Sequence, residues 1–142
     1  MISSRLARRD SLLFVYGTLR PFVDLPVSRW LRRTARYLGP AITAGRLYDL
    51  GAYPGMRAAR NSGDRVVGDV YRVVQSRVFR ALDRYEAGNA SCTPRFVRQR
   101  CVVKLGQRGM RKPAWVYRYR YSVAGALRIS SGDYREHRSP TR

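Results

Sequence analysis

Residues 12–20 read LLFVYGTLR, a continuous apolar run that ends in a Gly-Thr pair. A short apolar run that glycine closes is typical of a strand buried on both of its faces. After such a strand, successive backbone N–H groups over residues 16–19 can turn toward one anion or carbonyl oxygen. The plainer alternative is an ordinary turn between a strand and a loop. The run therefore predicts the first strand of the core and a candidate binding turn at its end.

The rest of the chain predicts about six strands and two helices in total. Apolar residues recur at helical spacing from Asp24 to Leu38, where Gly39-Pro40 is expected to end the first helix. A second helix is expected from Ser76 to a stop at Gly88. Further strands are expected over residues 42–48, 66–74, 96–105 and 114–123. Strands and helices do not alternate regularly, which favours an α+β domain whose curled sheet is mixed or mainly antiparallel.

The length of 142 residues indicates one domain. We expect it to span residues 12–136, between a flexible basic N-terminal tail over 1–11 and a C-terminal tail over 137–142. The apolar run after residue 11 is too short for a signal sequence or a membrane span, so we expect no membrane association and a cytoplasmic location. An opening rich in Arg and Ser also fits an organelle presequence.

The charge of the chain is its most unusual bulk property. It has 29 Lys and Arg residues against nine acids, a net charge of +20. Such a field can indicate a nucleic-acid partner. However, the cations are spread from Arg5 to Arg142, and no common nucleic-acid motif is present. We therefore expect only weak electrostatic binding to nucleic acid.

Most familiar catalytic motifs are missing from the sequence. It has no GxSxG, Walker, GxGxxG or HExxH motif. The single histidine, His137, lies in the predicted tail, which disfavours a nucleophile–histidine pair. One histidine and scattered acids predict no metal site, and Cys92 and Cys101 lack the spacing of a disulfide framework or a zinc site. Carboxylate chemistry supported by backbone donors remains.

Glu86 is the strongest candidate for that chemistry, because the other glutamate, Glu136, lies near the C-terminal end. Glu86 stands at the end of the second predicted helix, where the helix dipole disfavours a negative charge. Asp83, one turn earlier, adds like-charge repulsion. Both effects would raise the pKa of the Glu86 carboxyl toward that of a useful base. The plainer alternative is an exposed glutamate that Arg84 neutralises.

Residues 115–121 read WVYRYRY, which is similar to an aromatic and basic surface for single-stranded nucleic acid. In a strand, however, Tyr117, Tyr119 and Tyr121 would share one face while the arginines between them share the other. We therefore expect a half-buried strand with tyrosines inside and arginines in water.

Taken together, several short segments resemble the γ-glutamylcyclotransferase superfamily, in its small bacterial branch close to the AIG2-like proteins. They occur in order across residues 12–134 and read FVYGTLR (14–20), GRLYD (45–49), YPGM (53–56), VGDVY (67–71), LDRYE (82–86), FVR (96–98), AWVY (114–117) and SGDY (131–134). The resemblance implies a small β-barrel-like fold flanked by helices, with a cavity at one mouth.

The resemblance also implies an activity and a set of site residues. Glu86 matches the acid/base glutamate of the family. The substrate would be a γ-glutamyl compound whose free α-amine attacks its own γ-carbonyl, giving 5-oxoproline and a free amine without a cofactor. The implied substrate-binding residues are Tyr16, Gly17, Thr18, Leu19, Tyr53 and Tyr117.

Arg20, beside the turn, is a further candidate, for the α-carboxylate of the substrate, although a surface cation is an equally good interpretation. Two residues depart from the family pattern. Ala87 follows the glutamate where glycine is usual, and Phe96 replaces a common tyrosine. Two alternatives to the enzyme stay open, namely an inactive small-molecule-binding member of the same fold and a basic nucleic-acid-binding protein.

Overall fold

The apolar run forms strand β1 (Leu12–Val15), and all four of its residues are buried. In the computed structural model, which describes residues 11–87 and 95–138, this strand lies between two hydrophobic cores. Leu12 and Phe14 pack in one core, and Leu13 and Val15 pack in the other. Successive side chains of a strand point to opposite faces. A strand with a core on each face must therefore be apolar at every position, as predicted.

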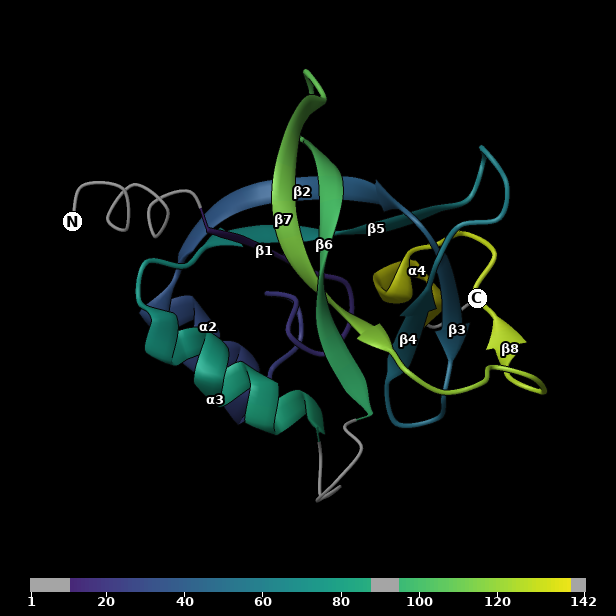
Figure 1. The fold of residues 1–142 in the computed structure, drawn as a ribbon, viewed down its shortest axis with the longest axis horizontal. Coiled ribbons are helices and arrows are strands. Elements are labelled where there is room, and N and C mark those ends of the chain that lie inside the picture. Colours follow the sequence, from purple (N-terminus) through teal and green to yellow (C-terminus); the bar gives the residue numbers. More distant parts are fainter. Residues whose placement is uncertain (1–10, 88–94, 139–142) are drawn as a thin grey trace.

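Five strands close into a barrel in the order β1, β5 (Arg65–Arg72), β2 (Arg36–Ala44), β6 (Phe96–Leu105) and β7 (Met110–Tyr119). β1 pairs antiparallel with β5 and parallel with β7, while the other pairs are antiparallel. All five strands contribute apolar side chains to the core that contains Phe14. The predicted α+β fold with a curled, mixed, barrel-like sheet is confirmed (Figure 1).

A smaller antiparallel sheet has the order β4 (Pro54–Arg57), β3 (Arg46–Asp49), β8 (Leu127–Arg128). The chain then forms the short helix α4 (Tyr134–Arg138). Within α4, Nε2 of His137 lies 2.9 Å from a carboxylate oxygen of Asp49 on β3. Helix α4 therefore extends to residue 138, one residue past the point where the C-terminal tail is expected to begin, and the domain boundaries stay a prediction.

Helices α2 (Pro26–Thr34) and α3 (Ser76–Ala87) both contribute to one core on the same side of the barrel (Figure 1). Leu31 of α2 and Val78 and Leu82 of α3 are fully buried in the core that also contains Leu13. The predicted second helix is confirmed up to residue 87. Its expected stop at Gly88, the N-terminal residues 1–10, Cys92 and residues 139–142 lie outside the described residues.

No helix in the described ranges is long and apolar enough to cross a membrane. The cytoplasmic location stays a prediction.

The first helix is shorter than its apolar spacing predicts. It ends at Thr34, and the chain is extended from Ala35 into β2. Gly39 and Pro40, expected to stop the helix, lie inside this strand, where the pairing with β5 shifts register between Tyr37 and Gly39. Gly39 has a φ of 133°, a conformation that only glycine adopts readily. Pairing of this part of β2 with β5 overrides the local helical pattern.

Arg20 connects the turn after β1 to two distant parts of the chain. Its side chain is buried, its Nε donates to Oδ2 of Asp69 at 2.8 Å, and its Nη1 donates to Oδ1 of Asp133 at 2.9 Å. Asp69 belongs to β5, and Asp133 immediately precedes α4. A buried carboxylate that loses its cation keeps an uncompensated charge. Arg20 is therefore a structural residue of the fold.

We predict that Arg20→Gln lowers the free energy of unfolding by roughly 3–5 kcal/mol, because Asp69 would be left buried and unpaired. Urea unfolding followed by circular dichroism measures the change. The control is Arg29→Gln, which breaks an exposed ion pair with Asp24 and should cost below about 1 kcal/mol. Equal effects of the two substitutions would contradict the structural role of Arg20.

Candidate active site

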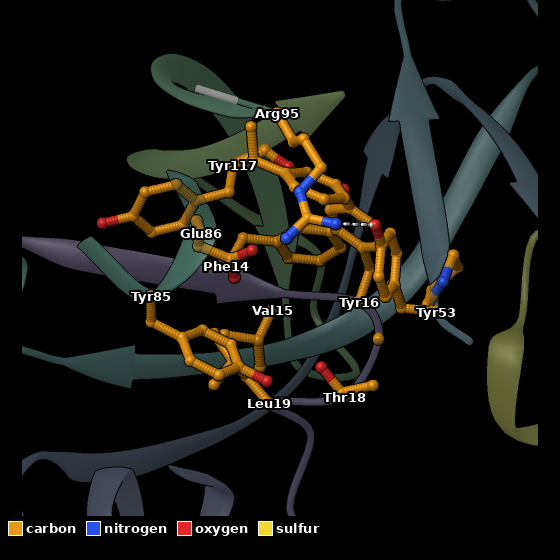
Figure 2. Close-up of a pocket in the computed structure, with 13 residues that line it drawn as sticks. Phe14, Val15, Tyr16, Thr18, Leu19, Tyr53, Tyr85, Glu86, Arg95 and Tyr117 are labelled. Carbon is orange, nitrogen blue, oxygen red and sulfur yellow. Dashed lines mark hydrogen bonds between the residues drawn. The ribbon is translucent and has the colours of Figure 1, made fainter. Parts of the chain in front are cut away.

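A cavity of about 170 Å³ opens where β1 ends, next to the C-terminal end of α3 (Figure 2). Its lining comes from five parts of the chain, namely residues 14–19, 53–54, 85–86, 95–96 and Tyr117. The volume of this cavity is smaller than the volumes of about 300–1,000 Å³ that are usual for cavities with drug-sized ligands. The cavity therefore suits a group the size of an amino acid.

The cavity brings together most of the residues that the sequence singles out. Glu86 lies in one lining with the turn over residues 16–19, with Tyr53 and with Tyr117. The segments that contain these residues are far apart in the sequence and meet only because the barrel closes. Their position in one cavity agrees with the expected arrangement, while their individual roles stay predictions.

Gly17 is required by the close approach of β4. A Cβ atom at this position would lie 2.6 Å from Cγ of Pro54 and 2.8 Å from its Cδ. The N–H of Arg20 donates to the carbonyl of Gly17 at 3.0 Å, which closes a turn around Thr18 and Leu19. A residue without a side chain therefore lets the YGT and YPGM segments pack against each other at the cavity wall.

Tyr16 ties this turn to two neighbouring strands. Its hydroxyl donates to the carbonyl of Tyr117 at 2.6 Å and accepts the N–H of Met56 at 3.1 Å. Burial raises the pKa of the Tyr16 hydroxyl well above its usual range, and the charge of Glu86 raises it further. The phenol is therefore a neutral structural donor, and its hydroxyl is already engaged by the protein.

Glu86 is the penultimate residue of α3, and its carboxyl group points into the cavity (Figure 2). Burial of the carboxyl raises its pKa from 4.5 to about 8, an effect that the nearby charge of Arg95 opposes. Removal from water disfavours the charged form, which explains the direction. Near neutral pH this carboxyl can both accept and return a proton.

The raised pKa of Glu86 was expected, but the expected contribution of Asp83 is wrong, while that of the helix dipole stays a prediction. Asp83 is not among the groups that raise the pKa of Glu86, and its carboxylate is paired with other groups. The Asp83 carboxylate accepts hydrogen bonds from Nε and Nη2 of Arg98 at 3.0 and 3.2 Å and from the hydroxyl of Tyr117 at 2.6 Å. Desolvation of the glutamate replaces like-charge repulsion as the main effect.

Arg95, which is not among the predicted site residues, is the cation in the described lining of the cavity. Its guanidinium extends into the cavity close to Glu86, and its Nη1 donates to the hydroxyl of Tyr53 at 2.9 Å (Figure 2). Nothing in the sequence distinguishes it from the many other arginines. Arg20, the expected cation, does not line this cavity and is held by two aspartates instead.

The arrangement suits proton transfer on a small anionic substrate. It combines a carboxyl with a pKa of about 8, a cation and the turn over residues 16–19 with several aromatic side chains. Among residues 11–87 and 95–138, no three His, Cys, Asp or Glu side chains cluster as metal ligands would.

The chain is thus a small α+β barrel protein with a cavity that contains a titrating carboxyl. A family model described as gamma-glutamyl cyclotransferase, AIG2-like, matches residues 13–136. The chain therefore belongs to the AIG2-like γ-glutamyl cyclotransferase family. It has no significant match among curated proteins.

Solved structures agree with this family. The chain is 29% identical to the protein YtfP from Escherichia coli, with a TM-score of 0.61. The alignment covers 90% of this chain and 99% of YtfP. The chain is 27% identical to YkqA from Bacillus subtilis, with a TM-score of 0.68, covering 89% of its own length but 40% of YkqA. An AIG2-like protein from Mus musculus, 23% identical over 79% of each chain with a TM-score of 0.63, shows the same fold.

Because the folded pKa of Glu86 is raised, its ionisation destabilises the protein as pH increases. The folded state binds the proton of Glu86 more tightly than the unfolded state does. The loss of folding stability caused by ionisation is therefore absent below pH 4.5 and grows until the pH passes about 8. We predict that Glu86→Gln stabilises the protein by roughly 5 kcal/mol at pH 9, at about 1.4 kcal/mol per pKa unit. The two proteins should be equally stable at pH 4.

Urea unfolding at pH 4, 7 and 9 measures this difference. The control is Tyr85→Phe, which changes the neighbouring, exposed side chain and should give no difference that grows with pH. A stability difference between Glu86→Gln and the unsubstituted protein that is the same at all three pH values would contradict the buried carboxyl.

Proposed function

We propose that this protein is a γ-glutamylcyclotransferase-type enzyme, which converts a γ-glutamyl amine or γ-glutamyl amino compound to 5-oxoproline and a free amine. The single observation that supports this proposal is the Glu86 carboxyl, with a pKa of about 8, in one cavity with the turn after β1. Membership of the family supports the same reaction class.

In the first step, Glu86 acts as a general base. The α-amino nitrogen of the substrate attacks its own γ-carbonyl carbon, a C–N bond forms, and the carboxylate takes the proton from nitrogen. An α-amino group has a pKa of ~7.7–8.0, close to that of this carboxyl. The two groups are therefore matched for proton transfer, which is worth about 10²–10⁴-fold in rate.

The turn over residues 16–19 supports the same step. Attack places negative charge on the carbonyl oxygen, and backbone N–H groups of this turn would stabilise it, by roughly 3–4 kcal/mol for one well-placed donor. Nucleophile and electrophile belong to one molecule, so a cavity of limited size that holds the folded conformer supplies much of the remaining advantage.

In the second step, Glu86 acts as a general acid. The tetrahedral intermediate collapses, the bond from the former γ-carbonyl carbon to the leaving nitrogen breaks, and the protonated carboxyl gives its proton to that nitrogen. Glu86 returns to its carboxylate form. No electrons leave the substrate, so the reaction requires no redox cofactor.

We further propose that Arg95 binds the α-carboxylate of the glutamyl group, the role first expected of Arg20. Arg95 lines the cavity and is held by Tyr53, whereas Arg20 is engaged by two aspartates. A planar guanidinium recognises a carboxylate through two parallel hydrogen bonds.

We predict that Glu86→Gln lowers 5-oxoproline formation at least about 100-fold, because the amide cannot take up the amine proton. The assay incubates the protein with γ-glutamyl amines, γ-glutamyl amino acids and other γ-glutamylated metabolites and measures 5-oxoproline. The control is Arg84→Gln, an exposed residue on the same helix, which should keep its rate. Equal turnover by Glu86→Gln and the unsubstituted enzyme would exclude this role, and the absence of turnover with every compound would favour a binding protein.

We predict that Arg95→Gln raises KM about tenfold or more and moves the rise of kcat/KM to higher pH. The second effect follows because the charge of Arg95 lowers the pKa of Glu86, and the carboxylate is the active base. Steady-state kinetics between pH 6 and 10 measures both quantities, again with Arg84→Gln as control. An unchanged KM together with an unchanged pH profile would contradict the role of Arg95.

A further inference from the structure

A different cavity, of about 300 Å³, lies between β4 and the strands β6 and β7. Four arginines line it, and we call it the arginine cavity: Arg46, Arg57, Arg118 and Arg120. Arg118 follows Tyr117, which lines the candidate active site, and adjacent residues of a strand point to opposite faces. The arginine cavity and the cavity of Glu86 have none of their described lining residues in common.

Main-chain and tyrosine oxygens hold two of these cations in place. Nη1 of Arg57 donates to the carbonyls of Tyr119 and Arg120 at 3.2 and 3.3 Å, where β7 ends beside β4 (Figure 1). Arg46 is buried, and it donates to the carbonyl of Ala58 and to the hydroxyl of Tyr48, both at 2.7 Å. These partners are neutral, so they fix the guanidinium groups without cancelling their charge.

The arginine cavity also contains a buried donor without a partner. Nε of Arg118 is inaccessible to solvent and has no hydrogen bond in the described part of the chain. A buried donor left unsatisfied typically costs about 1–3 kcal/mol. Since a guanidinium carries five N–H donors, Arg118 has capacity for a further acceptor.

Negative charge is missing from this cavity. None of the described residues that line it is acidic, and none of its four arginines forms an ion pair with the described acids. By contrast, the buried Arg20 is paired with two aspartates. An excess of cations leaves many arginines unpaired in this chain, but on a convex surface water compensates them.

A concave site with several fixed cations and an unsatisfied donor has the properties of an anion site. Guanidinium groups match the geometry of phosphate oxygens and donate to them in pairs. A phosphate group has more acceptor oxygens than a carboxylate and can accept from several of these arginines at once. We propose that the arginine cavity binds the phosphate group of a small molecule.

This site does not depend on the proposed cyclotransferase activity. Its cations come from β3, β4 and β7 and from the residue after β7, and none of them lines the cavity of Glu86. The two proposals can therefore fail separately.

The test is calorimetric titration of the protein with inorganic phosphate at constant ionic strength. We expect saturable binding of one phosphate per chain, and binding at least about tenfold weaker for the double variant Arg118→Gln and Arg120→Gln. The matched control is Arg108→Gln and Arg111→Gln, which removes the same charge from two exposed positions of the β6–β7 hairpin and should leave the affinity unchanged.

Arg118 is partly buried, so Arg120→Gln alone, at an exposed position, is measured as well and should also weaken binding. Circular dichroism confirms that each variant is folded. Absence of saturable binding, or equal weakening by the control pair, would overturn the proposal and leave only a general effect of charge. Binding of an oligonucleotide through Arg118 and Arg120 without binding of inorganic phosphate would also overturn it.

Discussion

The closure of the barrel through β1 is the constraint on which both the fold and the site depend. β1 joins β5 on one side and β7 on the other, and its side chains fill two cores at once. The turn that follows is held by Tyr16, which bonds to β7 and β4, and by Arg20, which bonds to Asp69 and Asp133. The cavity wall therefore consists of backbone that the core and these buried bonds hold rigidly.

The position of Glu86 follows from the same packing. α3 is held against the barrel by buried apolar side chains and by the contacts of Asp83 with Arg98 and Tyr117. This places the end of the helix beside the cavity at the end of β1, where the carboxyl of Glu86 loses water. Desolvation makes the carboxyl useful as a base near neutral pH and at the same time reduces stability, a cost common at functional sites.

The excess of arginine has several distinct uses in one small domain. Arg20 neutralises one buried and one partly buried carboxylate, Arg98 fixes Asp83, and Arg95 brings a cation into the candidate active site. Other arginines gather in a cavity whose described lining contains no acid, where a buried donor of Arg118 has no partner among the described residues. Net charge alone distinguishes none of these uses, since each depends on which neighbours surround the guanidinium group.

The sequence by itself determined the strand at residues 12–15, the helix that carries Glu86 near its end, the α+β class and the family, because these depend on local periodicity and short motifs. Only the tertiary structure decided that Gly39 and Pro40 belong to a strand, since their pairing with β5 outweighs a local helical pattern. Only the tertiary structure decided that Arg95, and not Arg20, is the cation beside Glu86. Only the tertiary structure decided that desolvation, and not repulsion by Asp83, raises the pKa of Glu86. Burial and charge pairing depend on residues that are distant in the chain, and one sequence does not show which of them meet.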